Sequence, residues 1–335
     1  MGYVALYMGV LAAGYFLGSK LRDRREKMGF LDGLTNFCVS LLVFVMGIKM
    51  GSNEEVIANL GTIGIQSVVI TVILAVITIA GVTMARLALG MNKYALTKKQ
   101  VAELGEMGTG SSGERQSASA EAEEGGSNLM TILILAFTVV GLIAGYFVVR
   151  NNDGLMSAFD ASNGHIMTVG LCLLMLSIGL GMGLDGTVLT YLKQAGFRVL
   201  VFPVVVIAAT TVGGFVVSLL YRDLSVGESL AICYGFGWYT FAPIAISNAG
   251  YVMAGAISFL HNVIRELAGI VLMPILAKKI GYLEVASIPG VAAMDVCLPI
   301  VERVTRQDII IYSFLIGFSQ AIFVPILVNM ALAFA

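Results

Sequence analysis

Long apolar runs dominate this chain. A run that crosses a bilayer must fold as a helix or as part of a closed barrel, because lipid cannot satisfy free backbone hydrogen-bonding groups. Runs long enough to cross as helices cover residues 2–19, 34–50, 62–89, 129–149, 164–184 and 197–221. The 335 residues are 58% hydrophobic and only 12% charged, whereas soluble domains carry about 25% charged residues. The sequence therefore predicts an all-α polytopic membrane protein.

Several other classes of protein do not fit the composition. The net charge of −1 offers no general attraction for nucleic acid. The four cysteines are scattered and both histidines are isolated, so we expect no metal site, disulfide framework or cofactor. Motifs of membrane-embedded enzymes, such as HExxH or GxSxG with a partner His, are missing from the sequence. The first apolar run lacks a basic leader and is predicted to be a retained span.

Basic residues alternate between successive connections and thereby set the orientation. Five Lys and Arg residues fall within 20–27, whereas residues 51–60 contain none. Basic residues return after the third run, and residues 150–163 hold a single Arg. This pattern predicts an N-terminus outside the cell, and the basic residues of the last third place the C-terminus outside as well.

The first two-thirds of the chain divide into two similar units. Residues 91–128 are rich in Gly, Ser and Glu and are predicted to form a flexible cytoplasmic linker between residues 1–90 and 129–221. Each flanking unit holds three apolar runs. An odd number of spans inserts the second unit upside down relative to the first, which is typical of secondary transporters.

Short matches at a constant spacing support this inverted repeat. Ala13-Gly-Tyr-Phe recurs as Ala144-Gly-Tyr-Phe, 131 residues later. Met46-Gly-Ile-Lys-Met-Gly recurs as Ile178-Gly-Leu-Gly-Met-Gly, 132 residues later. Gly81 likewise aligns with Gly213.

The last unit, residues 222–335, holds a weaker internal pair. Gly237-Trp-Tyr-Thr-Phe-Ala-Pro-Ile resembles Ala293-Met-Asp-Val-Cys-Leu-Pro-Ile, and Gly269-Ile-Val-Leu-Met-Pro resembles Gln320-Ala-Ile-Phe-Val-Pro. Each half is predicted to be a broken or re-entrant segment followed by a full span. The whole chain then has about eight full spans plus two broken segments. An arrangement of ten spans fits the same charge pattern.

Glu266 and Asp295 lie in surroundings that are apolar enough to be embedded in lipid. A charge at the bilayer centre costs roughly 2.5–3.5 kcal/mol on insertion scales. One interpretation is a structural ion pair with a basic group such as Arg265, and the other is a site for a cation or proton. On a helix, Asn262 and Glu266 share one face, whereas Arg265 points elsewhere and snorkels or pairs with another group.

Helix-breaking residues surround these acids, and freed backbone groups at membrane depth can bind a small polar cargo. The candidate backbone positions are Gly235, Gly237, Pro243, Pro289, Gly290 and Pro299. Trp238 and Tyr239 either pack against an aliphatic stem or a cation, or belong to the core or an interfacial belt. Asn248 is either polar lining of the site or part of a turn.

Three motifs together resemble the bacterial lysine exporter family, LysO: Gly235-Phe-Gly-Trp-Tyr, Asn262-Val-Ile-Arg-Glu, and Met294-Asp followed by Leu298-Pro. The resemblance is strongest over residues 165–335. It implies export of L-lysine and thialysine-like analogues across the bacterial cytoplasmic membrane, with functional acids at Glu266 and Asp295. The family pattern often has an acid where this chain has Val263, so that acid's role is missing here. The resemblance also implies a scaffold, a moving core and crossed broken helices.

The expected partners are lysine, protons and the lipid bilayer, with a homodimer allowed and no nucleic acid. Moving one positive charge out of the cell costs about 2.3 kcal/mol per 100 mV, and exchange for a proton cancels that charge. A carboxylate could serve both ions, because protonation and ammonium binding compete for it. The alternatives are a carrier for another amino acid or cation on the same scaffold, and a membrane-embedded enzyme.

Overall fold

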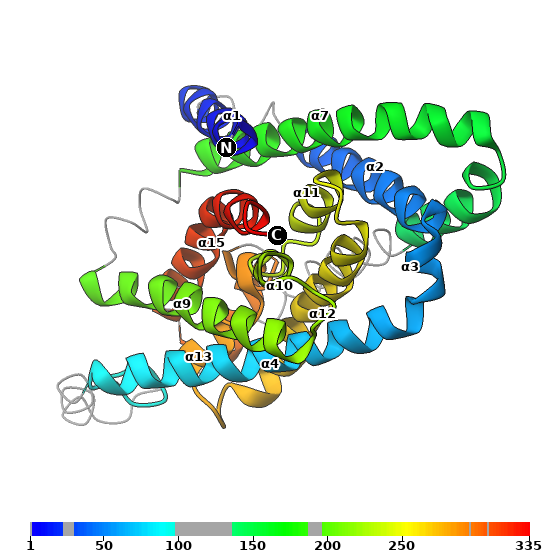
Figure 1. The fold of residues 1–335 in the computed structure, drawn as a ribbon. Coiled ribbons are helices and arrows are strands. Elements are labelled where there is room, and N and C mark those ends of the chain that lie inside the picture. The colour runs from blue at the N-terminus through cyan, green and yellow to red at the C-terminus, as the bar shows by residue number, and fades with distance from the viewer. Residues whose placement is uncertain (1, 23–29, 98–135, 187–195, 295, 307) are drawn as a thin grey trace.

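The computed structural model describes residues 2–22, 30–97, 136–186, 196–294, 296–306 and 308–335, and these residues are mostly helical (Figure 1). The elements along the chain are α1 (Gly2–Lys20), α2 (Phe30–Ser52), α3 (Glu54–Ala58), α4 (Leu60–Ala88), the helix Ala136–Val149 with its π-helical end η2 (Gly145–Val149), α7 (Asp153–Asp185), α9 (Phe197–Leu220), α10 (Val226–Cys233), α11 (Ala242–Asn248), α12 (Val252–Leu276), α13 (Tyr282–Ala286), the 3-10 turn η3 (Gly290–Met294), α14 (Leu298–Val304) and α15 (Ile309–Leu332).

Six of the described helices contain segments long and apolar enough to cross a membrane: α2, α4, α7, α9, α12 and α15. These helices confirm the prediction of an all-α polytopic membrane protein. Many large apolar side chains face outward, such as Phe37, Ile65 and Leu219, as a lipid-facing surface requires. The full span count, the position of the termini and the inverted repeat stay predictions.

Helices α1, α2, α7 and Ala136–Val149 pack together through glycines (Figure 1). A Cβ atom at Gly18 would lie 2.2 Å from the Leu180 carbonyl oxygen, and one at Gly51 would lie 2.1 Å from the Leu142 carbonyl oxygen. Small residues of this kind let helix backbones approach closely where lipid, rather than water, surrounds them. These four helices form one side of the molecule.

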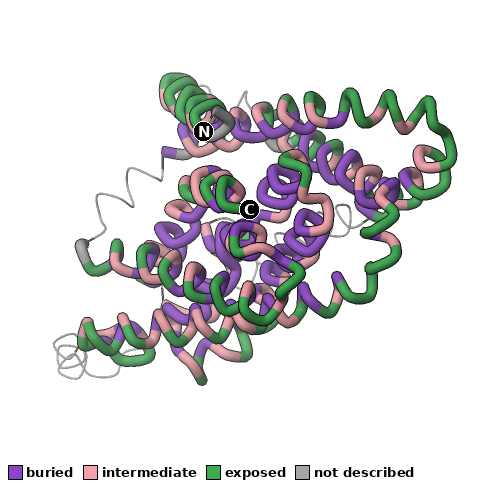
Figure 2. Tube along the Cα trace, viewed as in Figure 1, coloured by how far each residue is buried: buried purple, intermediate pink, exposed green. Residues whose placement is uncertain are grey.

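On the opposite side, α4 packs against α9, and the elements from α10 to α15 lie between the two sides (Figure 1). Most of the buried residues belong to this middle group (Figure 2). Two short helix pairs, α10 with α11 and α13 with α14, are each followed by a long helix, α12 and α15 respectively. The chain is thus interrupted twice where broken segments were expected.

Helix α7 is longer than the sequence predicted. The prediction treated residues 150–163 as an external loop, but α7 begins at Asp153, so that boundary is wrong. The Asn152 side chain caps the helix by accepting a hydrogen bond from the Leu155 N–H at 3.1 Å. A helix of 33 residues is about 50 Å long and exceeds the bilayer core, so its polar first turns can extend into water.

The start of the expected linker is part of the packed structure. Residues 91–97 fold back on themselves through a bridge between Met91 and Thr97. The Lys93 carbonyl accepts a hydrogen bond from the Tyr282 N–H at 2.9 Å, which fastens this segment to α13. The rest of the expected linker lies outside the described residues.

We expect Gly18→Ala to destabilise the protein, because its methyl group would clash with the backbone of α7. Overpacking of this kind costs about 1–3 kcal/mol. Gly9→Ala is the matched control on α1, since no atom lies within 4 Å of a Cβ there. Thermal unfolding in detergent should show a lower midpoint for Gly18→Ala alone. Equal midpoints for the two variants would contradict the close packing of α1 on α7.

Candidate functional site

The two interruptions of the middle group meet through their backbones. The first break lies between α10 and α11, and the second break lies between α13 and α14. The Val291 N–H donates a hydrogen bond to the Phe236 carbonyl at 2.8 Å, which joins them directly. A Cβ atom at Gly237 would lie 2.5 Å from the Pro289 carbonyl oxygen. The predicted positions Gly235, Gly237, Pro289 and Gly290 are therefore brought to one crossing.

The backbone at the crossing is locally strained. Gly237 and Gly290 have positive φ angles of 82° and 76°, which glycine adopts readily. Phe236 also has a positive φ, 46°, which costs a residue with a Cβ of order 1–3 kcal/mol. Its ring is fully buried, and the Arg265 guanidinium lies 5.7 Å from the ring centroid. Packing around the buried ring thus stabilises a backbone conformation that a residue with a Cβ rarely adopts.

Helix α12 fixes both sides of the crossing with two side chains. Asn262 Oδ1 accepts a hydrogen bond from the Gly237 N–H at 2.6 Å. Arg265 Nε donates one to the Ile288 carbonyl at 3.0 Å. Backbone groups outside a helix need a protein partner where lipid excludes water. These two side chains supply that partner for the Gly237 N–H and the Ile288 carbonyl.

Close approach also explains the glycine at 235. A Cβ atom there would lie 2.3 Å from Asn262 Nδ2. The same Nδ2 donates to the Ser258 carbonyl at 2.7 Å, which fixes the amide orientation. The Asn262 amide therefore donates to a carbonyl of its own helix and accepts from an N–H of the first break.

Helix α15 supports the second break in a comparable way. Ser313 Oγ donates to the Ala293 carbonyl at 2.7 Å. Gly317 lies so close to the break that a Cβ atom there would be 2.6 Å from the Met294 nitrogen. In the sequence match between the two halves, Ser313 corresponds to Asn262 and Ala293 to Gly237. Each of the two long helices thus holds one break through a polar side chain, Asn262 on α12 and Ser313 on α15.

The structure places one of the two predicted acids. Glu266 lies one turn after Asn262 on α12, and only 6% of its surface is exposed. Asp295 lies outside the described residues. Arg265 is buried as well, with 4% of its surface exposed, so the interpretation that it snorkels to the surface is wrong. Its side chain instead points to the second break.

The predicted aromatic residues pack against other aromatic rings. Trp238 lies 5.3 Å from Phe241 between ring centroids, and Phe241 in turn meets Tyr7 of α1 at 5.3 Å. Tyr239 meets Phe259 edge-on at 6.4 Å. These contacts link the first break to α1 and α12. A direct role in cargo binding stays a prediction for both residues.

The remaining predicted residues lie around the start and end of the short helices. Pro243 and Pro299 stand in the first turns of α11 and α14, where a missing N–H costs nothing. Asn248 ends α11, and its Nδ2 lies 3.2 Å from the Thr168 hydroxyl of α7. It therefore connects the middle group to the outer helices.

A buried ion pair between α4 and α13 was not predicted. Arg86 Nε lies 2.6 Å from Glu284 Oε1, and the Thr83 hydroxyl donates to the same oxygen at 2.9 Å. Glu284 is completely buried. The only sequence signal was Arg86 inside the third apolar run. Among the described residues, no group of three or more His, Cys, Asp and Glu side chains is arranged to hold a metal ion.

These features define a multi-pass membrane protein whose buried polar site lies where two broken helical segments cross. The family model for the lysine exporter LysO matches residues 8–101 and 135–332. The chain belongs to this family and is a multi-pass protein of the bacterial cytoplasmic membrane.

Two relatives agree with this assignment. "Lysine exporter LysO" of Escherichia coli K12 is 23% identical over 321 residues, which cover 95% of each chain. A "putative lysine exporter" of Haemophilus influenzae is 31% identical over 96 residues, or 28% of this chain and 48% of the relative. No solved structure matches the chain.

We expect Asn262→Ala to destabilise the protein by about 1–3 kcal/mol, because it leaves the buried Gly237 N–H without an acceptor. Asn329→Ala is the control, since that half-buried amide donates locally to the Pro325 carbonyl of its own helix and the change should alter stability by less than about 0.5 kcal/mol. Denaturant unfolding in detergent measures both. If Asn262→Ala is as stable as the control, Asn262 does not hold the first break.

Proposed function

We propose that this protein exports L-lysine, and thialysine-like analogues, from the cytoplasm in exchange for protons. The observation that carries the proposal is the crossing itself: two breaks clamped by α12, with Glu266 buried one turn from Asn262. The family supplies lysine as the cargo, because the E. coli relative is a lysine exporter by name.

The crossing offers the chemistry that a cationic amino acid needs. Glu266 supplies a carboxylate, and we assign the same role to Asp295. Carbonyls at a break can accept hydrogen bonds from an ammonium group, and the first turn of a half-helix favours a carboxylate. A carboxylate binds either a proton or an ammonium. Deprotonated acids would therefore take lysine from inside, and protons from outside would displace it.

Matched contacts between the outer units support the architecture of an alternating-access carrier. Gly81 of α4 faces Ala209 of α9, while Gly213 of α9 faces Leu74 and Ile77 of α4. Adding 132 to Gly81 gives Gly213, and subtracting 132 from Ala209 gives Ile77. The α4–α9 contact is thus repeated when the two units are exchanged, as an inverted repeat requires.

We expect Glu266→Gln to abolish lysine efflux from proteoliposomes while the protein stays folded, because glutamine cannot exchange a proton for an ammonium. Glu302→Gln is the matched control, since Glu302 is an exposed acid on α14 and should keep wild-type efflux. The measurement is release of preloaded radiolabelled lysine. Efflux at the wild-type rate in Glu266→Gln would remove this residue from the mechanism.

Proton exchange makes a second prediction about the driving force. Lysine efflux from wild-type vesicles should rise when the receiving side is made acidic, because protons there displace the cargo. Asp295→Asn should lower efflux and flatten its dependence on the pH gradient. Lysine efflux that ignores the gradient would leave lysine as cargo but contradict proton exchange. A folded wild type without lysine efflux would favour another cation as the cargo.

A further inference from the structure

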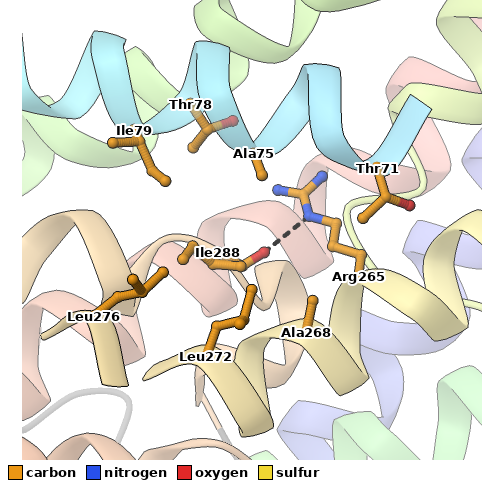
Figure 3. Close-up of a pocket in the computed structure, with 9 residues that line it drawn as sticks. All are labelled: Thr71, Ala75, Thr78, Ile79, Arg265, Ala268, Leu272, Leu276 and Ile288. Atoms are coloured by element: carbon orange, nitrogen blue, oxygen red, sulfur yellow. Dashed lines mark hydrogen bonds between the residues drawn. The ribbon is translucent and has the colours of Figure 1, made fainter. Parts of the chain in front are cut away.

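The middle group contacts α4 through buried polar side chains. The Ser67 hydroxyl of α4 donates a hydrogen bond to the Ile257 carbonyl of α12 at 3.1 Å, and the Thr71 hydroxyl lies 2.8 Å from His261 Nδ1. All four residues are buried. A cavity of about 50 Å³ lies between the same two helices, where the Arg265 guanidinium extends toward α4 (Figure 3). Because breaking a buried hydrogen bond leaves its groups unsatisfied, we expect α4 to stay attached to the middle group.

The middle group meets the outer helices α2 and α7 through a different kind of contact, at the end of α11. The Lys49 ammonium of α2 donates a hydrogen bond to the Ser247 carbonyl of α11 at 2.6 Å. Asn248 Nδ2 donates to the Thr168 hydroxyl of α7 at 3.2 Å. Lys49, Asn248 and Thr168 are only half-buried. Partners that water can replace exchange at small net cost, so these contacts can break and form again.

The end of α11 suits a cation such as Lys49. Ser247 lies in the last turn of this helix, where carbonyls without a partner in the helix carry negative partial charge. Asp160 of α7 adds an acid that interacts electrostatically with Lys49. The ammonium stands on a flexible four-carbon stem, so it can leave the Ser247 carbonyl and return to it without a change in the backbone of α2.

Helix α11 connects this contact to the first break. The helix spans Ala242–Asn248, which is about 10 Å along its axis. At its other end, the Ala242 N–H donates to the Trp238 carbonyl of the first break at 3.1 Å. A movement of the end of α11 therefore also moves the break that carries the proposed cargo site.

We propose that Lys49 positions α11 and thereby closes one end of the carrier. While Lys49 and Asn248 hold α11 against α2 and α7, the crossing is closed to that end. When both contacts break, the middle group moves with α4 relative to α2 and α7, and the crossing opens. Lys49 directly precedes residues 51–60, which the charge pattern places outside the cell. The inference rests on the proposed function, because a carrier with alternating access must close one end while the other is open.

A native cysteine can report on this contact. Cys172 follows Thr168 by four residues on α7, so it lies on the same face of the helix, one turn further along. It is half-buried and packs against the main hydrophobic core. The test is labelling of Cys172 in the full chain with a membrane-impermeant maleimide, in right-side-out membrane vesicles without lysine. Peptide mass spectrometry identifies which of the four cysteines carries the label.

We expect Lys49→Met, which removes the ammonium and keeps most of the stem, to speed labelling of Cys172 about tenfold. Lys49→Arg retains a cationic donor and should restore the wild-type rate. Lys93→Met is the matched control, because Lys93 Nζ also donates to a backbone carbonyl, that of Lys278 at 3.2 Å. That contact does not involve α2, α7 or α11, so labelling should not change.

Equal rates of Cys172 labelling in wild type and Lys49→Met would overturn the proposal. Labelling of all four cysteines in Lys49→Met would mean general unfolding and would overturn it as well. A Lys49→Arg variant that is labelled as fast as Lys49→Met would contradict the role of the positive charge.

Failure of this inference can be told apart from failure of the proposed function. Labelling without lysine does not depend on the cargo, whereas efflux does. A wild type without lysine efflux would contradict the proposed function, and faster labelling of Lys49→Met would still support the closing contact. A wild type that exports lysine and loses export with Glu266→Gln, but shows no effect of Lys49→Met on labelling, would contradict only the role of Lys49.

Discussion

The structure depends on backbone groups that two helix breaks release at membrane depth. Lipid cannot bond with them, so protein must. The Phe236 carbonyl and Val291 N–H bond with each other, and Asn262 and Arg265 bond with the flanking residues. Each contact needs both breaks or α12 to be in place, so the crossing forms as one unit. The left-handed Phe236 is tolerated for the same reason.

Helix α12 therefore has two polar faces with different tasks. One face directs Asn262 to Gly237 in the first break, and the other directs Arg265 to Ile288 beside the second break. Because Arg265 Nε is occupied at Ile288 while Nη1 is unpartnered among the described residues, a single side chain connects the crossing to the cavity beside α4.

Many features of the fold and part of the site could be predicted from the residues alone. Apolar runs located the long helices, and Gly and Pro located both breaks, because these signals are local. The start of α7 was misjudged, since a capped helix can continue beyond the bilayer with polar residues. The buried pair of Arg86 and Glu284 was missed because its partners are 198 positions apart. For Arg265, helical periodicity gave a direction but no partner, so it could not decide between snorkelling and the buried contact with the Ile288 carbonyl that the structure shows.

The sequence by itself determined that this chain is an all-helical membrane protein of the lysine exporter family with an acid at Glu266 in apolar surroundings. Hydropathy and short motifs carry that information. Only the tertiary structure decided that Gly237 and Pro289 lie against each other, that Asn262 holds one break and Arg265 the other, and that Thr78 lines a cavity beside Arg265. Those facts depend on how distant helices pack, because buried polar groups must find partners wherever the fold brings them.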